Sequence, residues 1–303
     1  MRLFAPLLFL VVAGLVELAA ALWIPGRATS LEEFERARDA VARIAKPGDL
    51  IVVAPRWAEP LARAAFGDEL MPIAHLARAD DSSFARAIEV RLPGAPASPV
   101  ELWPAIQAVA AGELLLSVRE NPAPLRPVFR FLENLERASV FLERRGRRDA
   151  CPWTERGAPS AGGLHGAVAF PRRRFQCPGG AELFVGITLI DDQYYRPRRC
   201  IWAHPPHRGA LVIRFDDVPL GERVTGYAGL SYFLFRDGGG APVGLELRVG
   251  ARKVGRYQHR DELGWAAFAF ATPGKVGRRG DVEFRVTSPD ARQRHFCFYA
   301  DTR

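Results

Sequence analysis

The chain has only 3 lysines and 2 methionines among 303 residues, and the other 39 of its 42 basic residues are arginine. Its glycines form no G-x-G-x-x-G pattern after an apolar strand, and there is no G-K-S or G-K-T, so no nucleotide or dinucleotide site is predicted. No two cysteines have the short spacing of a zinc knuckle, and no G-x-S-x-G elbow occurs. The sequence therefore predicts no cofactor, and nothing in it indicates an enzyme directly.

An apolar run extends from Leu3 to Ile24 behind Arg2. Its length of about 22 residues is enough to cross a bilayer as a helix, and the positive charge of Arg2 places the N-terminus in the cytoplasm. We therefore expect a single-pass transmembrane anchor over residues 1–26, with the remaining domains periplasmic or at the cell surface. The alternative is a cleaved signal peptide with Ala19 and Ala21 before the cut, which would secrete the same domains.

All four cysteines lie in the second half of the chain. In an exported region they indicate two disulfides, and four cysteines allow three pairings. Cys200 opens one predicted strand and Cys297 lies in the last one, and the first and last strands of a sandwich are often neighbours. We therefore expect a Cys200–Cys297 bond, which leaves Cys151 with Cys177.

Apolar periodicity in residues 27–143 alternates between helical and strand patterns, which is typical of a small sheet flanked by helices. A helix is well marked at Ser30, where Ser30 is the N-cap and Glu33 takes the capping-box position. The sequence thus predicts a small α/β domain. Its expected elements are the helix from Ser30 to before Pro47, strand Leu50–Ala54, helix Ala58–Phe66, strand Ala87–Leu92, helix Val100–Ala111 and strand Glu113–Val118.

After Glu143 the pattern changes to short alternating segments separated by glycine and proline, as in β-sandwiches. Residues 144–180 are expected to be a basic, Gly/Pro-rich linker, and residues 181–303 to form about eight strands, the number a jelly roll uses. The predicted fold class is α+β and multidomain: a membrane helix, a small α/β domain and an antiparallel β-sandwich. In architecture this C-terminal half resembles jelly-roll carbohydrate-binding domains, and the resemblance implies glycan binding.

Positive charge is concentrated between Arg144 and Arg208, which carry +7 of the formal +8. Guanidinium groups bind phosphates and carboxylates through two parallel hydrogen bonds. Nucleic acid is not an expected partner outside the cytoplasm, which leaves anionic lipid headgroups or acidic envelope glycans, and a solvated linker is the alternative. The basic clusters include Arg144, Arg145, Arg147 and Arg148, and the candidate anion-binding residues are Arg172, Arg173, Arg174, Arg198 and Arg199.

The segment Tyr257–Trp265 concentrates hydrogen-bonding groups and two aromatic rings. Sugar binding uses this mixture, because an aromatic ring covers the apolar face of a pyranose while polar side chains bind its hydroxyls. Burial of the tryptophans in the core is the alternative. The candidate glycan site comprises Tyr257, His259, Asp261, Trp265 and Trp202.

His204 and His207 are separated by two prolines, whose polyproline II geometry brings both imidazoles to one face. They are candidate metal ligands, but no third ligand is identifiable and an exposed turn is the simpler interpretation, so no metal is predicted.

Together these patterns predict a membrane-anchored extracytoplasmic module that binds a glycan or assists envelope assembly. One alternative is an extracytoplasmic polysaccharide hydrolase or lyase with His204, His207, His259 and Asp261 at its site. The other is a structural accessory partner of an integral-membrane glycosyltransferase, in which the arginines bind an acidic protein partner or lipid.

Overall fold

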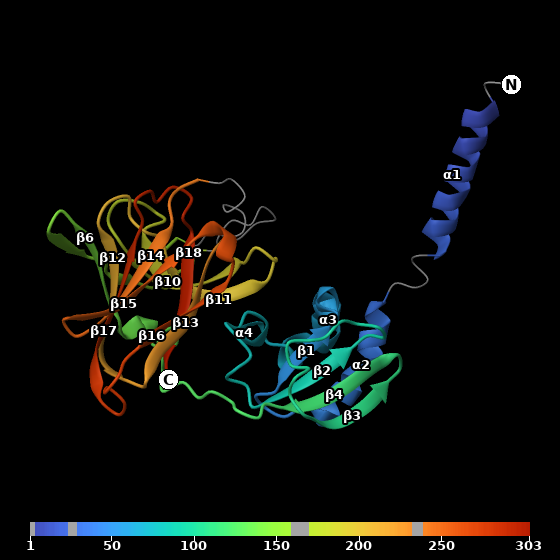
Figure 1. The fold of residues 1–303 in the computed structure, drawn as a ribbon, viewed down its shortest axis with the longest axis horizontal. Helices are drawn as coiled ribbons and strands as arrows, with labels where there is room; N and C mark the ends of the chain where they lie inside the picture. Colours follow the sequence, from blue (N-terminus) through green and yellow to red (C-terminus); the bar gives the residue numbers. More distant parts are fainter. Residues whose placement is uncertain (1–3, 24–28, 159–169, 232–238) are drawn as a thin grey trace. The chain divides into compact units, whose positions relative to one another are not determined.

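The computed structural model describes residues 4–23, 29–158, 170–231 and 239–303. The chain is mostly β-strand, with few helices, and divides into two units (Figure 1). Unit 1 consists of Met1–Pro72 and Ala85–Pro122, and unit 2 consists of Ile73–Phe84 and Ala123–Arg303.

Helix α1 spans Phe4–Trp23. A helix needs a sustained apolar stretch of about 20 residues to span the hydrocarbon core. Within the described ranges, no helix is both long enough and apolar enough to do so. The predicted N-terminal membrane helix is therefore wrong, and so is the fold class that included it.

Unit 1 contains a four-stranded sheet in the order β1-β2-β4-β3, in which β1 and β2 are parallel and the other pairs are antiparallel. Its helices pack on each other and on this sheet. The elements are α2 (Leu31–Ile44), β1 (Leu50–Ala54), the 3-10 helix η2 (Arg56–Ala58), α3 (Glu59–Leu70), β2 (Arg86–Arg91), β3 (Ala105–Ala111) and β4 (Leu114–Glu120).

The apolar pattern explains the first elements of unit 1. Phe34, Ala37 and Val41 lie on one side of α2 at helical spacing and are fully buried. All five residues of β1 are buried, as expected for a strand covered on both faces. These two elements and strand β2 confirm the sequence expectation.

The predicted helix Val100–Ala111 is wrong, because Ala105–Ala111 forms strand β3. The segment is rich in alanine, which favours helix when considered alone. Its backbone instead pairs with β4, and Gly112 at φ +65° makes the tight turn between the two strands. Pairing in the sheet therefore overrides the local preference.

Unit 2 contains two antiparallel sheets. The eight-stranded sheet has the order β16-β13-β18-β11-β10-β9-β8, with β5 paired to β18, and the six-stranded sheet has the order β15-β14-β17-β12-β6-β7. Two further 3-10 turns are η3 (Leu135–Arg137) and η4 (Asp261–Leu263). The strands are β5 (Phe129–Arg130), β6 (Ser139–Arg144), β7 (Arg147–Ala150), β8 (Trp153–Thr154), β9 (Arg174–Gln176), β10 (Phe184–Asp191), β11 (Pro197–Ala203), β12 (Ala210–Pro219), β13 (Arg223–Leu230), β14 (Val243–Val249), β15 (Arg252–His259), β16 (Ala266–Ala271), β17 (Arg279–Thr287) and β18 (Phe296–Thr302).

One hydrophobic core joins the inner faces of the two sheets. On β14, Val243, Leu245 and Leu247 are fully buried in it, and on β17 Phe284 packs edge-on against Phe131. Each such side chain contributes about 1.5–3 kcal/mol when fully buried. The alternation leaves every second residue of the six-stranded sheet on its outer face, where charged side chains collect.

Residues 144–180, expected to be a linker, contribute β7, β8 and β9 to the two sheets, and residues 159–169 lie outside the described ranges. Two disulfides are confirmed, Cys151–Cys177 and Cys200–Cys297, and these are the expected pairs. The second bond joins β11 to β18, which are neighbours in the eight-stranded sheet. Disulfides persist in oxidising compartments, so this pairing supports an extracellular or otherwise oxidising location.

A short segment from the first half of the chain belongs to unit 2. Ile73–Phe84, which contains helix α4 (Ile73–Leu76), lies against β11: the carbonyl of Ala77 accepts a hydrogen bond from the Arg199 amide at 2.8 Å. The carbonyl of Arg78 accepts another from Arg198 at 2.9 Å. These two hydrogen bonds attach the Ile73–Phe84 segment to strand β11 of the eight-stranded sheet.

Candidate anion-binding site

Trp202, predicted as part of a glycan floor, is fully buried. Its ring stacks on Phe184 with the centroids 5.3 Å apart, and its Nε1 donates to the carbonyl of Glu182 at 3.0 Å. A ring enclosed in this way offers no face to a sugar. Trp202 is a core residue of unit 2.

Trp265 is half-buried and already has partners. Its Nε1 donates to the carbonyl of Ala79 at 3.2 Å, its ring stacks on Tyr227 at 6.2 Å, and the Arg198 guanidinium lies 5.5 Å from the ring centroid. The indole thus attaches the Ile73–Phe84 segment to the sheet.

The structure places the polar members of the predicted glycan site in two pairs, in which His259 is buried while Tyr257 and Asp261 are half-buried. The Tyr257 hydroxyl and His259 Nδ1 are 3.1 Å apart, and Asp261 forms an ion pair with Arg294, a residue that the sequence did not single out. Burial lowers the pKa of His259 to about 4 and raises the pKa of Tyr257 to about 12. These contacts hold the polar side chains of the predicted site to other residues of unit 2.

Of the two candidate metal ligands, His204 is buried and His207 is exposed. His204 packs beside Trp202 and His295, with centroids 6.2 and 5.6 Å away, and burial lowers the pKa of both His204 and His295 to about 4. In the described part of the chain, no three His, Cys, Asp or Glu side chains are grouped so as to hold a metal ion.

Four of the five predicted anion-binding arginines have internal partners. Arg174 is buried and donates to the carbonyls of Ala158 and Pro171, each at 3.0 Å. Arg198 pairs with Asp192, Arg173 with Glu136 and Glu155, and Arg199 with Glu133, while Arg172 is exposed. Arg173 and Arg199 thus pair with glutamates from before residue 144, and Arg198 pairs with a carboxylate of the basic stretch itself.

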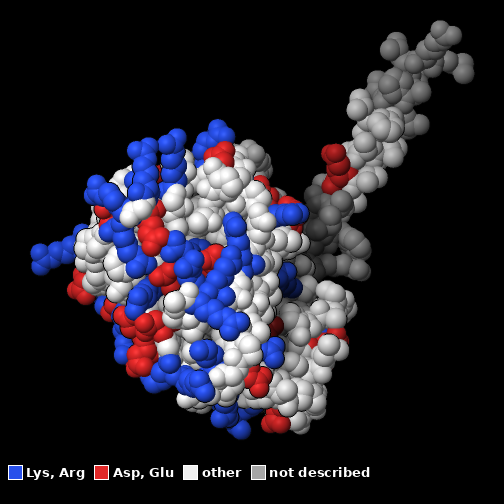
Figure 2. All heavy atoms as spheres, turned by 60° about the vertical axis from the view of Figure 1, so that its left-hand side comes forward, with Lys and Arg blue, Asp and Glu red and all other residues white. Residues whose placement is uncertain are grey.

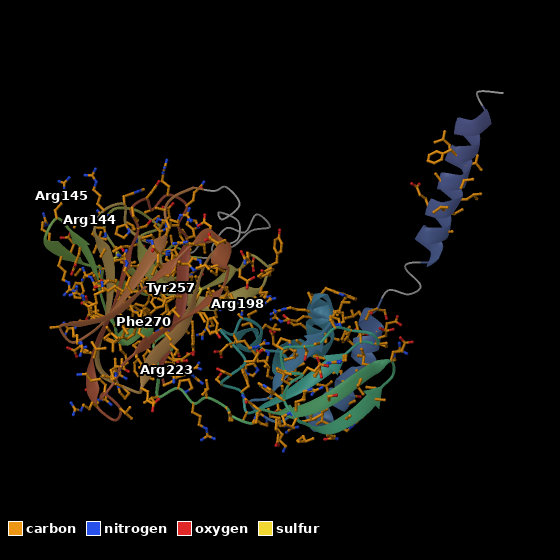
Figure 3. All side chains as sticks on the ribbon, in the orientation of Figure 1. Arg144, Arg145, Arg198, Arg223, Tyr257 and Phe270 are labelled. Atoms are coloured by element: carbon orange, nitrogen blue, oxygen red, sulfur yellow. A yellow bond between two sulfur atoms is a disulfide. The ribbon has the colours of Figure 1, made fainter. Side chains whose placement is uncertain are left out.

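Another group of arginines from the same basic stretch lies at the hairpin that joins β6 to β7. It borders a hollow of about 450 Å³ on unit 2. Arg144 and Arg145 project from the hairpin at the left of Figure 3, and in Figure 2 basic side chains gather on this side of unit 2. The charged lining consists of Glu143, Arg144, Arg145, Arg147, Arg148 and Arg285.

The backbone creates the hollow by a close approach. Gly209 has φ +91°, and a Cβ at this position would lie 1.8 Å from the carbonyl oxygen of Glu143. Only glycine fits there, so the chain entering β12 can lie directly against the end of β6. At the hairpin tip, Arg145 and Gly146 both have positive φ, which turns the chain sharply and presents the arginine side chains outward.

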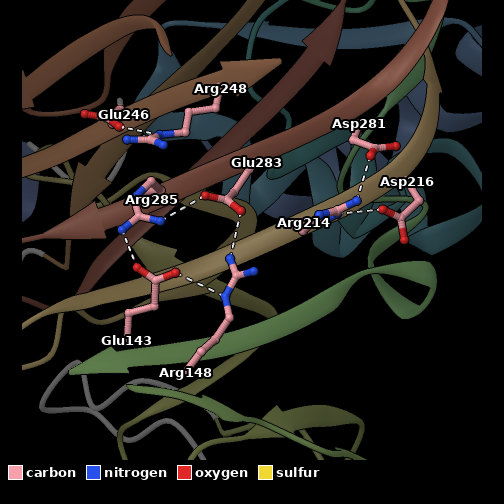
Figure 4. Close-up of polar contacts among 9 residues, drawn as sticks. All are labelled: Glu143, Arg148, Arg214, Asp216, Glu246, Arg248, Asp281, Glu283 and Arg285. Atoms are coloured by element: carbon pink, nitrogen blue, oxygen red, sulfur yellow. Dashed lines mark hydrogen bonds and ion pairs between the residues drawn. The ribbon is translucent and has the colours of Figure 1, made fainter. Parts of the chain in front are cut away.

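A ladder of ion pairs on the outer face of the six-stranded sheet fixes one wall of the hollow (Figure 4). Glu143 accepts a hydrogen bond from Arg285 and forms an ion pair with Arg148 at 3.1 Å, and Glu283 accepts hydrogen bonds from the same two arginines at 3.0 and 2.9 Å. The hydrogen bond from Arg285 holds the pKa of Glu143 below its ordinary value. Arg148 also lies over the Phe141 ring, 4.4 Å from its centroid.

Three arginines of the lining are less constrained. Among the described residues, Arg147 pairs only with Asp149, at 3.3 Å, and its side chain is 82% exposed. Arg144 lies beside Gly179, whose Cβ would be 3.1 Å from the Arg144 Nη1, and Arg145 is exposed. The hollow therefore has a positively charged rim over a wall of fixed arginine and glutamate pairs, an arrangement that can receive an anionic group.

The chain matches no protein-family model and no curated protein. Solved structures to which it is similar include the CBM51-2 and INT domains of Clostridium perfringens ZmpB, with a TM-score of 0.28 and 9% identity over 54% of this chain and 37% of that chain. A second is the M60 catalytic domain with the CBM51-1 and CBM51-2 domains of ZmpB, with a TM-score of 0.28 and 10% identity over 54% of this chain and 17% of that chain. A third is the enzymatically active domain of bacteriophage CBA120 tailspike protein 4, with a TM-score of 0.21 and 13% identity over 39% of this chain and 17% of that chain.

Carbohydrate-binding domains are thus among the structural neighbours, in line with the architectural resemblance predicted from the sequence. The matches span well under two thirds of those chains. TM-scores of this size carry no argument about the ligand of this chain.

Proposed function

We propose that unit 2 is a binding module for acidic glycans and that the arginine-lined hollow at the β6–β7 hairpin is its binding site. The observation that carries the proposal is the composition of the lining, in which five arginines stand against one glutamate around about 450 Å³. Ligand sites commonly enclose 300–1,000 Å³, so this space suits one or two sugar units.

The chemistry of the lining favours a carboxylate or sulfate group on the glycan. Guanidinium groups bind such anions through two parallel hydrogen bonds. Among the described residues, few ion pairs would have to break for Arg144, Arg145 and Arg147 to bind an anion. Arg148 and Arg285 are held by glutamates and so contribute a rigid wall. Thr287 also lines the hollow and supplies a hydrogen-bonding hydroxyl for neutral groups of the glycan.

An oxidising location agrees with this ligand class, because extracytoplasmic proteins meet acidic polysaccharides directly. The enzyme alternative depended on His204, His207, His259 and Asp261, and two of these, His204 and His259, are buried. The accessory-partner alternative depends on Arg172, Arg173 and Arg174, of which Arg174 is buried and Arg173 pairs with Glu136 and Glu155.

The test is a calorimetric titration of the full chain with a uronic acid oligosaccharide and with its carboxyl-reduced, neutral form. We expect the acidic form to bind and the neutral form to bind at least tenfold more weakly, since hydrogen bonds to charged groups contribute about 1.5–3 kcal/mol. The double variant Arg144→Ala/Arg145→Ala should lose about tenfold or more in affinity.

Arg223→Ala is the matched control, because Arg223 lies on β13 in the other sheet and does not line the hollow (Figure 3). It should leave the affinity unchanged. Equal binding of the acidic and neutral glycans, or equal loss in the hairpin and control variants, would refute the proposal. Binding to anionic vesicles in place of the acidic glycan would assign the site to lipid.

A further inference from the structure

Unit 1 has a hollow of its own, of about 390 Å³. Its lining comes from chain segments that meet at one edge of the four-stranded sheet. Trp57 follows β1, Leu92–Pro96 follows β2, and Glu113 precedes β4, which runs antiparallel to β2. Glu33 in the first turn of α2 completes this edge. The hollow therefore lies outside the carboxyl ends of the two parallel strands.

The carboxyl ends of parallel strands are a common place for ligand sites. In open α/β sheets, ligands bind outside the carboxyl ends of the parallel strands, where the loops diverge and leave a crevice. Here the carbonyl of Ala54 accepts a hydrogen bond from the Leu92 amide at 2.8 Å, so the ends of β1 and β2 are held together up to the rim. The loops beyond them contain Pro55, Pro93 and Pro96, which restrict the backbone around the hollow.

The charged side chains of this hollow are acidic, whereas those of the hollow in unit 2 are mainly arginines. Two carboxylates, Glu33 and Glu113, line it together with the indole of Trp57, which is 64% exposed. Neither carboxylate has a hydrogen-bond or ion-pair partner among the described residues. No lysine or arginine lines the hollow in the described part of the chain, although the protein carries a formal +8.

We propose that unit 1 binds a small organic ammonium compound in this hollow. An ammonium group is attracted to the face of a tryptophan ring and to carboxylates, and the apolar body that carries it packs on the indole and the prolines. The start of α2 also points to this edge with the partial positive charge of a helix N-terminus, about +0.5. Two full negative charges outweigh it, so the hollow keeps its preference for a cation.

A metal ion fits this lining less well than an organic cation. Hard divalent ions take six or more oxygen ligands, while the hollow offers two carboxylates and an exposed aromatic ring that contributes nothing to coordination. The ring and the proline-rich wall are useful only to a ligand with an apolar body. The proposal is independent of the acidic-glycan site, because the two hollows share no residue.

The test compares choline with 3,3-dimethylbutan-1-ol, which has the same shape but carries carbon in place of the charged nitrogen. The full chain is titrated with each compound by calorimetry at millimolar concentration. We expect choline to bind and the neutral compound to bind about tenfold more weakly. Trp57→Ala should weaken choline binding about tenfold, and Glu33→Gln and Glu113→Gln should each weaken it several-fold.

Glu35→Gln is the matched control, because Glu35 is an exposed residue of α2 outside the lining, and its substitution changes the net charge by the same amount. It should leave choline binding unchanged, and the far-ultraviolet circular dichroism of each variant shows whether unit 1 is folded. No binding of choline, equal binding of the neutral compound, or a loss in Glu35→Gln as large as in Glu33→Gln would overturn the proposal. Preferential binding of Ca²⁺ over choline would overturn it as well.

Discussion

Asp192 and Arg198 form an ion pair whose side chains are only 2% and 9% exposed, with Asp192 Oδ2 3.0 Å from Arg198 Nε. The other oxygen of Asp192 accepts hydrogen bonds from the amides of Tyr194 and Arg196, at 2.8 and 3.1 Å. Burial lowers the pKa of Arg198, although the nearby carboxylate opposes this shift. One carboxylate thus holds the β10–β11 turn and compensates a buried cation.

Replacing Asp192 should therefore cost far more than replacing a surface carboxylate. Asp192→Asn leaves the Arg198 charge buried without compensation, and we expect a loss of about 3–5 kcal/mol in the free energy of unfolding. Asp216→Asn is the control, since Asp216 is 60% exposed in its pair with Arg214 and should cost at most about 1 kcal/mol. Urea denaturation measures both, and similar losses in the two variants would contradict this view of the pair.

The two disulfides should differ in their contributions to stability. Cys200–Cys297 closes a loop with a sequence separation of 97, and Cys151–Cys177 one of 26. Chain entropy alone predicts losses of about 4.7 and about 3.5 kcal/mol on removal. Paired Cys→Ser variants, compared by thermal unfolding under oxidising conditions, should show the larger loss for Cys200 and Cys297. A larger loss for the shorter loop would mean that packing outweighs chain entropy here.

Buried histidines make stability depend on pH. The pKa of His259 is lowered to about 4 in the fold, against 6.5 in the unfolded chain, because burial disfavours the charged ring. Between these two values the unfolded state binds more protons, so stability is retained above about pH 6.5 and is lost as the pH falls toward about 4. We expect His259 to account for about 2–3 kcal/mol of this loss.

Urea denaturation of the wild type and of His259→Gln at several pH values between 7 and 4 measures this contribution. The variant should be less stable at pH 7 but should lose less stability on acidification. An unaltered slope in His259→Gln would show that His204 and His295, which also have lowered pKa values, cause the pH dependence.

The sequence predicted those elements whose own residues carry a clear helix or strand pattern. Strand β1 is an unbroken apolar run and α2 has both a helical stripe and an N-cap residue, so both were predictable. Strand β3 was not, because its alanines favour helix and only β4, a partner across a turn, makes it a strand. Helix α1 was predicted to span a membrane because of the length of its apolar run. No helix in the described residues is long and apolar enough to do so.

The assignment of Ile73–Phe84 to unit 2 could not be predicted from the sequence for a related reason. Ile73–Phe84 lies within the first half of the chain but contacts β11 mainly through backbone carbonyls, such as those of Ala77 and Arg78, and carbonyls carry no sequence signal. The arginine clusters were visible as charge, but which arginines have acidic partners depends on residues as distant as Glu133 and Arg199. Only the folded chain shows which arginines are held by carboxylates, as Arg148 and Arg285 are, and which are largely exposed, as Arg147 is.

Removing the negative charge from the hollow should strengthen the binding of an acidic glycan. Glu143 is the acidic residue of its lining and pairs with Arg285 and Arg148, both of which keep Glu283 as a second partner. We therefore expect Glu143→Gln to raise the affinity several-fold while costing less than about 1 kcal/mol in stability. The Asp216→Asn variant, with the same change in net charge, should not raise the affinity. Weaker binding in Glu143→Gln would mean that its carboxylate itself contacts the glycan.

The close approach at Gly209 should make this glycine essential both to stability and to the hollow. Gly209→Ala places a methyl group 1.8 Å from the Glu143 carbonyl oxygen at φ +91°, so the end of β6 must move and we expect a loss of more than about 3 kcal/mol. Gly250→Ala is the matched control: Gly250 also has positive φ, +60°, but a Cβ there would meet nothing within 4 Å. It should cost only about 1–2 kcal/mol from backbone strain. Denaturant unfolding compares the two, and calorimetry at a temperature where both remain folded should show weaker glycan binding only for Gly209→Ala. Equal stability losses would show that positive φ, and not the contact with Glu143, is what requires glycine at position 209.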